Sequence, residues 1–230
     1  MIVIAMVSQK GGVGKTTIAL NLAVEASAAG YPTVLVDLDP QVSAFHWSDM
    51  RDAETPVVIA PPVPHLSRAL QAAEADGVRL AIIDTAGRTN DAAAAAVKAA
   101  DLVLVPLKPS LIDLKTMDST LDIIRLSGTR PAQAVLTMVK PFGSRHDETA
   151  AWLQAQKVDV CPITVGERVA YQDAYSHGLS VTEADPSGKA ADEVRALFQH
   201  VGKLAGLTSG KPARGQRGKE GRKQSGGAAG

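Results

Sequence analysis

Near its start the chain reads Ile2-Val3-Ile4-Ala5-Met6-Val7-Ser8-Gln9-Lys10-Gly11-Gly12-Val13-Gly14-Lys15-Thr16-Thr17. The β-branched apolar residues at the beginning of this stretch predict a buried parallel strand. Residues 16–29 have helical spacing and stop at Gly30, which predicts a helix. In a strand, glycine loop and helix arranged in this order, backbone N–H groups surround phosphate oxygens, and the helix N-terminus favours the same anion.

The glycine loop therefore predicts a binding site for nucleotide phosphates. The Lys15 ammonium would lie against the β- and γ-phosphates, and the Thr16 hydroxyl would ligate Mg²⁺. A glycine turn before an ordinary helix is the alternative interpretation, and it does not account for the Lys15-Thr16 pair. The residues expected to bind ATP in this loop are Lys10, Gly11, Gly12, Val13, Gly14, Lys15, Thr16 and Thr17.

The rest of the chain alternates between strand and helix patterns. Strands are expected at 2–8, 33–38, 57–60, 80–84, 102–106, 134–139 and 160–164, and helices at 16–29, 42–51, 67–75, 91–100, 111–126, 148–156, 168–175 and 190–207. This alternation predicts an α/β fold, a single domain with a mostly parallel twisted sheet and helices on both faces. We place the domain at 1–207, and we expect residues 208–230, which have almost nothing to bury, to be disordered.

Two further strands end in carboxylates, in Asp37-Leu38-Asp39-Pro40-Gln41 and in Ile82-Ile83-Asp84-Thr85-Ala86-Gly87. The carboxyl ends of parallel strands meet at one edge, where such folds bind ligands. Asp84 ends an apolar strand in the Walker B pattern and is expected to reach Mg²⁺ through water, because Mg²⁺ takes few carboxylates. Gly87 would allow close approach to the γ-phosphate. The alternatives are turn residues: Asp39 before Pro40 also fits a helix entry, and Asp84 a strand end.

The loop departs from the usual phosphate-loop spacing at one position. Position 9 is Gln where the standard pattern has Gly, and a second lysine, Lys10, follows it. This is the deviant form K-G-G-x-G-K-[ST]-T, and in it the chain resembles the ParA/MinD family of ATPases over residues 1 to about 207. The resemblance implies ATP and Mg²⁺ as cofactors. It also implies an ATP-bound homodimer in which Lys10 reaches the phosphates of the partner chain.

The same resemblance implies roles for the carboxylates. The D-x-D-P-Q motif implies that Asp39 orients or activates the attacking water and that Asp37 holds the Mg²⁺ hydration shell. The catalytic residues are then Lys10, Lys15 and Asp39, and the metal residues Thr16, Asp37 and Asp84. Many family members have Asp-x-Pro-Pro at the Walker B end, and the Asp-Thr-Ala-Gly version here resembles the small ParF-like partition ATPases.

Two more segments receive roles by this resemblance. The proline-containing segment 105–113 resembles one that borders the dimer interface, which implicates Pro109 and Asp113. An ordinary strand-to-helix connection is the alternative there. The segment 137–141 lies at a late strand end, where family members contact adenine, which implicates Met138 and Lys140.

Charge is unevenly spread, although the net charge is zero. Residues 1–207 carry 18 Lys and Arg against 23 Asp and Glu, whereas residues 208–230 carry six basic residues against Glu220 alone. Nonspecific DNA binding, steeply dependent on salt, would use this tail and scattered basic side chains, namely Lys140, Arg145, Arg168, Lys189 and Arg195. A solubilising end is the alternative for the tail.

The leading hypothesis is an ATPase that partitions plasmid or chromosomal DNA in the cytoplasm and associates with the nucleoid when ATP is bound. No helix-turn-helix pattern precedes the loop, so we expect a separate small centromere-binding, ParB-like partner to read DNA sequence and stimulate hydrolysis. The alternatives are a related ATPase that positions another cargo, as MinD-like regulators do, and a module that does not hydrolyse ATP. The single Cys161 argues against a cluster-bridged reductase. We expect no stable membrane association, because the apolar face of helix 190–207 suits core packing.

Overall fold

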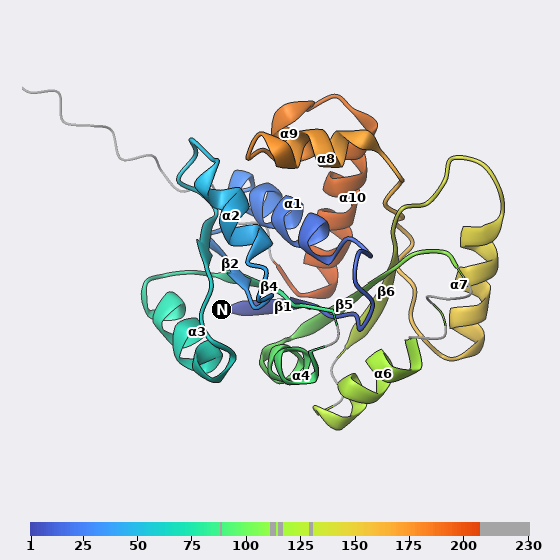
Figure 1. Ribbon diagram of the computed structural model, residues 1–230, viewed down its shortest axis with the longest axis horizontal. Coiled ribbons are helices and arrows are strands. Elements are labelled where there is room, and N and C mark those ends of the chain that lie inside the picture. Colours follow the sequence, from blue (N-terminus) through green and yellow to red (C-terminus); the bar gives the residue numbers. More distant parts are fainter. Residues whose placement is uncertain (88, 111–113, 115–116, 129–130, 208–230) are drawn as a thin grey trace, which may run out of the picture.

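The computed structural model describes residues 1–87, 89–110, 114, 117–128 and 131–207 (Figure 1). Six strands form one sheet in the order β3-β2-β4-β1-β5-β6, and every paired neighbour runs parallel. The strands are β1 Ile2–Met6, β2 Thr33–Asp37, β3 Val57–Ile59, β4 Leu80–Asp84, β5 Leu102–Leu107 and β6 Ala132–Leu136. The predicted α/β fold with a parallel sheet is confirmed.

Helices cover both faces of this sheet, as predicted. In Figure 1, α1, α2, α8, α9 and α10 lie on one face, α3, α4 and α6 on the other, and α7 beside β6. Their bounds are α1 Lys15–Ala28, α2 Ser43–Asp49, α3 Leu66–Ala75, α4 Asn90–Ala99, α6 Met117–Leu126, α7 Arg145–Ala155, α8 Val169–Ser176, α9 Val181–Ala184 and α10 Lys189–Leu204, with a 3₁₀ turn, η1, at Val63–His65.

Strand side chains point alternately to the two faces, so the sheet separates two apolar clusters. In β1, Val3 and Ala5 pack into the cluster under α3, α4 and α6. Ile4 and Met6 pack into the cluster under α1 and α10. Helices thus cover the sheet on both faces, and loops lie at the edge formed by the carboxyl ends of the strands.

One predicted strand is wrong. Residues 160–164 form no strand but only part of an irregular run beside β6, held by isolated parallel bridges at Val160 and Gly166. Cys161 N–H donates to the Ala134 carbonyl at 2.8 Å, but the next bond to β6 runs from the Val165 N–H to the Leu136 carbonyl at 2.9 Å. A regular parallel ladder would continue from residue 163, so two extra residues interrupt the pairing that the apolar pattern predicted.

The helices differ from the prediction at α9, at the start of α7 and at the end of α10, which is Leu204 rather than residue 207. The short helix α9 was not predicted, although Ser180 and Glu183 form a capping box that marks its start. Helix α7 begins at Arg145, three residues before the predicted start. The helix predicted at 111–126 is described from Met117, and residues 111–113 and 115–116 lie outside the described residues, as does the tail 208–230.

The C-terminal helix α10 turns its apolar face into the core. Val194, Leu197 and Val201 are all buried, which confirms the predicted core packing of this helix. In the part of the chain that the structure describes, no helix combines the length and the apolar character needed to cross a membrane.

Candidate functional site

The three motif loops meet at the carboxyl edge of the sheet. In the parallel register, Met6 of β1 and Asp37 of β2 both pair with Asp84 of β4. The strand ends are therefore level, and the chain that follows each of them emerges side by side. This arrangement brings together the glycine loop and the two carboxylate motifs, as the sequence predicted.

The glycine loop is shaped to hold an anion. Gly12 and Gly14 have positive φ angles of 69° and 88°, a backbone conformation that residues other than glycine rarely adopt. A Cβ added at Gly11 or Gly12 would meet no atom within 4 Å, so the space beside the loop is open in the side-chain direction at both positions. With α1 starting at Lys15, backbone N–H groups and a helix N-terminus border this space.

Lys15 is buried at the base of the loop. Its Nζ donates to the Lys10 carbonyl at 3.1 Å, which ties the two ends of the loop together. Burial lowers the pKa of the Lys15 ammonium, while the charges of Asp84 and Asp39 oppose that shift. Bound phosphate would add further negative charge beside this amine and restore the stability of its protonated form.

Asp84 and Thr16 together fit a magnesium site. The Thr16 hydroxyl donates to Asp84 Oδ2 at 2.6 Å. Asp84 is fully buried, and among the described residues its Oδ1 has no hydrogen-bond partner. Burial raises the pKa of Asp84 to about 7, and the neighbouring Asp37 charge adds to the rise against the effects of the Thr16 hydrogen bond and Lys15. A buried carboxylate oxygen without a partner is explained by a cation or its water ligand.

Gly87 braces the glycine loop. A Cβ at Gly87 would lie 2.9 Å from the Gly11 nitrogen and 3.2 Å from the Lys10 carbonyl carbon. These neighbours are backbone atoms, so only glycine fits at this position. The segment after β4 is thus packed directly against the loop, and its predicted approach to a γ-phosphate stays a prediction.

Asp37 holds the loop that carries Asp39. Its Oδ1 accepts the Asp39 N–H at 3.0 Å, and its Oδ2 accepts the N–H groups of Ala44 and Phe45 at 2.9 and 3.1 Å. The carboxylate therefore caps α2 across several residues, a role that the sequence analysis missed. Burial raises the pKa of Asp37, although these backbone hydrogen bonds oppose it. Its role toward Mg²⁺ stays a prediction.

Asp39 and Lys10 line the same cleft, of about 430 Å³, together with Gly11 and Gly87. Asp39 Oδ1 accepts the Gln41 N–H at 2.9 Å. The two predicted catalytic residues of the outer loops thus face one space beside the glycine loop. An attacking water next to the terminal phosphate would fit in it.

A second cleft, of about 450 Å³, adjoins the other end of the glycine loop. Residues of the loop and α1, the β6 end and α8 line it, among them Thr17, Met138, Arg168, Tyr171 and Tyr175. The Thr137 hydroxyl donates to the Val13 carbonyl at 2.8 Å, which fixes the β6 end against the loop. Tyr171 and Tyr175 were not predicted as site residues, although their spacing of four places both on one helix face.

Three further predicted site residues line a third cleft of about 480 Å³. Met138, Lys140 and Pro109 line it, so the structure brings the predicted adenine and interface residues together. Asp113 lies outside the described residues. Their roles toward adenine and a second chain stay predictions.

The basic residues predicted to contact DNA fall into two groups, those that line the third cleft and those that bind other groups of the chain. Lys140 and Arg145 line the third cleft. Arg168 is engaged within the chain, where its Nε donates to Glu193 Oε1 at 3.0 Å, and Arg195 donates to the Pro186 carbonyl at 2.7 Å. Ion pairs of Arg168 with Glu193 and of Arg195 with Asp192 offset part of the positive charge that these two arginines offer to DNA.

Comparison with known proteins places this geometry in a family. The model of the CobQ/CobB/MinD/ParA nucleotide binding domain matches residues 4–181. A maintenance of carboxysome distribution protein A from Gloeobacter kilaueensis is 33% identical over 202 residues, covering 86% of this chain and 91% of its own. A protein ParA from Rhizobium radiobacter is 29% identical over 187 residues, which cover 77% of this chain and 84% of that protein.

Solved structures share the fold at low sequence identity. Apo McdA from Cyanothece superposes with a TM-score of 0.72 at 19% identity, covering 88% of this chain and all of that one. A chain of the Aquifex aeolicus MinC:MinD complex gives a TM-score of 0.73 at 16% identity, and the match covers 94% of this chain and 100% of that chain. These likenesses support the fold alone.

Proposed function

Because the chain belongs to the MinD/ParA family of nucleotide-binding proteins, with ATP and Mg²⁺ as its cofactors, we propose that it is an ATPase that partitions or positions DNA. One observation carries the hydrolytic part of this proposal. The buried Asp84, with one carboxylate oxygen lacking a partner, lies against Thr16 at the foot of an open glycine loop. That combination suits a Mg²⁺-nucleotide and explains an otherwise costly buried carboxyl.

The residues divide the work of phosphoryl transfer. Phosphoryl transfer needs positioning and charge neutralisation more than covalent chemistry. The loop N–H groups and Lys15 hold the phosphates, Thr16 and Asp84 hold Mg²⁺, which supplies charge neutralisation when bound, and Asp39 orients the attacking water. Hydrolysis by the chain alone is slow in this proposal, and a ParB-like partner stimulates it.

Lys10 couples nucleotide state to assembly. It lines the cleft on the Asp39 side of the loop, where a second chain would approach. A lysine that contacts the ATP of a partner chain makes the homodimer depend on the triphosphate. Pro109 and Asp113 would lie in the same interface, and ATP-bound dimers would bind DNA nonspecifically in the cytoplasm, on the nucleoid.

Mass measurement in solution tests this cycle. We expect a monomer with ADP and a dimer with a slowly hydrolysed ATP analogue. Lys15→Ala is expected to abolish nucleotide binding, and Lys10→Ala to keep it while weakening the dimer. Asp39→Ala is expected to slow hydrolysis while sparing the dimer. A wild-type chain that stays monomeric with the ATP analogue would contradict the proposal.

DNA retention tests the partition role. Binding is expected with ATP and not with ADP or without nucleotide, and it is expected to weaken between low and moderate salt. Equal retention in all three nucleotide states would rule out an ATP-dependent DNA switch.

A second candidate is an ATPase that positions another cargo. The observation that favours it is the 33% identity with a carboxysome distribution protein over most of both chains. The two candidates share the nucleotide cycle and differ in the partner protein. A neighbouring gene for a small centromere-binding protein would favour DNA, whereas its replacement by a gene for a cargo adaptor would favour the second candidate.

A further inference from the structure

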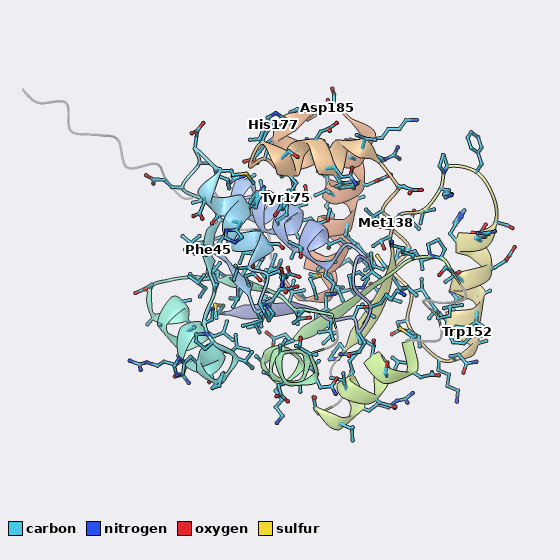
Figure 2. All side chains as sticks on the ribbon, viewed as in Figure 1. Phe45, Met138, Trp152, Tyr175, His177 and Asp185 are labelled. Atoms are coloured by element: carbon cyan, nitrogen blue, oxygen red, sulfur yellow. The ribbon has the colours of Figure 1, made fainter. Side chains whose placement is uncertain are left out.

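The hydroxyl of Tyr175 links the second cleft to α2. Tyr175, labelled in Figure 2, belongs to α8. It lines the second cleft, beside the glycine loop. Its ring packs against the apolar cluster under α1. From this position its hydroxyl donates to the carbonyl of Ser43, the first residue of α2, at 2.9 Å.

The Ser43 carbonyl and the Ala44 N–H belong to one peptide group. That N–H donates to Asp37 Oδ2 at 2.9 Å, and Asp37 Oδ1 accepts the Asp39 N–H at 3.0 Å. The peptide unit is planar and rigid, so a shift at its carbonyl also moves its N–H. Three hydrogen bonds therefore run from Tyr175 through α2 and Asp37 to the backbone of Asp39, and bonds in such a row polarise one another.

Further contacts join α2 and the residues that follow it to the segment that follows α8. Trp47 is fully buried and its Nε1 donates to the Leu179 carbonyl at 3.2 Å. Arg51 donates to the Gly178 carbonyl at 2.8 Å. Gly178 approaches so closely that an added Cβ would lie 2.6 Å from the Met50 carbonyl oxygen. A displacement of α8 at the cleft is therefore carried to α2 rather than absorbed between the two helices.

We propose that Tyr175 is a positioning residue for hydrolysis, which acts through the 43–44 peptide and Asp37 to hold Asp39 in place. A nucleotide seated against α8 in the second cleft then fixes the loop that orients the attacking water. This inference rests on the proposed function, because it assumes ATP hydrolysis and the role of Asp39 in it. It adds a residue of α8 to a site that the motif loops otherwise define.

Tyr171 provides the matched control. It lies one turn earlier on the same helix and lines the same cleft. Its hydroxyl contacts Glu193 Oε2 at 3.2 Å and the Ala190 carbonyl at 3.5 Å, on α10 and away from α2. Tyr171→Phe and Tyr175→Phe each remove one hydroxyl from the cleft wall, and only the second breaks the path to Asp39.

The test compares hydrolysis kinetics of the two variants. For Tyr175→Phe we expect kcat to fall about 5- to 10-fold, with KM and the Kd of ADP changed less than about twofold, because a lost positioning contact acts in the transition state. For Tyr171→Phe, which lines the same cleft but has no path to Asp39, we expect any loss to appear in KM and in the Kd of ADP rather than in kcat. In an Asp39→Asn background, Tyr175→Phe should add no further loss, because both changes remove the same function.

A second readout does not depend on hydrolysis. The amide proton resonances of Asp39 and Ala44 should shift in Tyr175→Phe and stay in place in Tyr171→Phe. If Tyr175→Phe unfolds, Tyr175→Met, which also lacks the hydroxyl, replaces it. Unchanged kcat with unchanged amide resonances, or a loss that adds in full to that of Asp39→Asn, would overturn the inference. A wild-type chain that binds ATP without hydrolysing it would instead refute the proposed function, and the amide resonances would still decide whether the path exists.

Discussion

Asp84 is a carboxyl whose protonation depends on burial and on what binds beside it. Its pKa is raised from 3.8 to about 7, chiefly by burial. A carboxyl with a raised pKa binds its proton more tightly in the folded than in the unfolded chain. Without Mg²⁺, folding therefore loses stability as pH rises from about 4 to about 7, and Mg²⁺, which needs the ionised form, binds better at the upper end of this range.

Asp84→Asn is predicted to remove this pH dependence. Without nucleotide and Mg²⁺, the variant should melt at a higher temperature than the wild type at pH 8 and at nearly the same temperature at pH 4. Asn keeps an oxygen for the Thr16 hydroxyl, so the comparison isolates the charge. Scanning calorimetry at both pH values measures it, and Mg²⁺-ADP should stabilise the wild type more than the variant. A difference in Tm that is the same at pH 4 and pH 8 would contradict the assignment.

Gly87→Ala is predicted to weaken nucleotide binding by displacing the glycine loop. The added Cβ would lie 2.9 Å from the Gly11 nitrogen, so backbone must shift. Since misplacement of about 1 Å in a positioning group costs on the order of 100-fold, we expect the Kd of ADP to rise at least about tenfold. Gly202→Ala in α10 is the matched control, because its nearest neighbour is the Leu207 side chain at 3.5 Å. ADP titration with unchanged Kd in Gly87→Ala would refute the bracing role.

At the level of elements, an ion pair joins Arg51, which follows α2, to Glu183 of α9. Arg51 NH2 lies 2.8 Å from Glu183 Oε1, the arginine side chain is almost fully buried, and its guanidinium lies 4.4 Å from the centre of the Trp47 ring. Burial would raise the pKa of Glu183, but the hydrogen bonds from Arg51 and Ser180 outweigh it and lower the pKa. The contribution of this carboxylate to stability is therefore present above the ordinary carboxyl range and lost as pH falls through it.

Glu183→Gln is predicted to lower the free energy of unfolding by about 1–2 kcal/mol, less than for a wholly buried pair because Glu183 is partly exposed. Gln can still complete the capping box with Ser180, so the loss reports the ion pair. Urea unfolding at pH 7 measures it. The control is Asp122→Asn at the exposed Arg125–Asp122 pair, which should change stability by less than about 0.5 kcal/mol. Equal effects of the two substitutions would contradict the prediction.

These elements also show which parts of the fold can be predicted from the sequence. Apolar runs before polar loops predicted each strand of the sheet, because a buried parallel strand needs little beyond such a run. Residues 160–164 have the same apolar character, but only isolated bridges form there, because two extra residues separate the bond at Cys161 from the next one at Val165. The Arg51–Glu183 pair joins residues 132 apart, and no local pattern predicts such a contact.

The site divides in the same way. Lys15, Thr16 and Asp84 follow from local spacing, and the structure brings them together at the foot of the loop. The capping of α2 by Asp37 and the contact from Tyr175 to Ser43 depend on how α2 and α8 pack. Local sequence patterns therefore predicted the residues of the motif loops and missed the contacts that hold these loops in place.

At the scale of the whole molecule, charge separates the domain from the tail. Residues 1–207 carry 18 basic and 23 acidic side chains, and residues 208–230 carry six basic ones and one acidic. Within the domain, Arg168 and Arg195 are engaged by neighbouring groups of the chain itself. DNA, which attracts basic segments through its phosphates, would therefore bind mainly to the tail.

Removal of residues 208–230 is predicted to weaken DNA binding and to flatten its salt dependence. Each neutralised phosphate contributes about 0.9 to the slope of log K against log salt, so loss of six cations lowers the slope by up to about 5. A full-length variant with the six tail cations replaced by Gln should behave like the truncated chain, which separates charge from length. Both should still dimerise with an ATP analogue, because the glycine loop and Lys10 are intact. If both retain DNA with the slope of the wild type, the domain itself binds DNA and the tail serves only solubility.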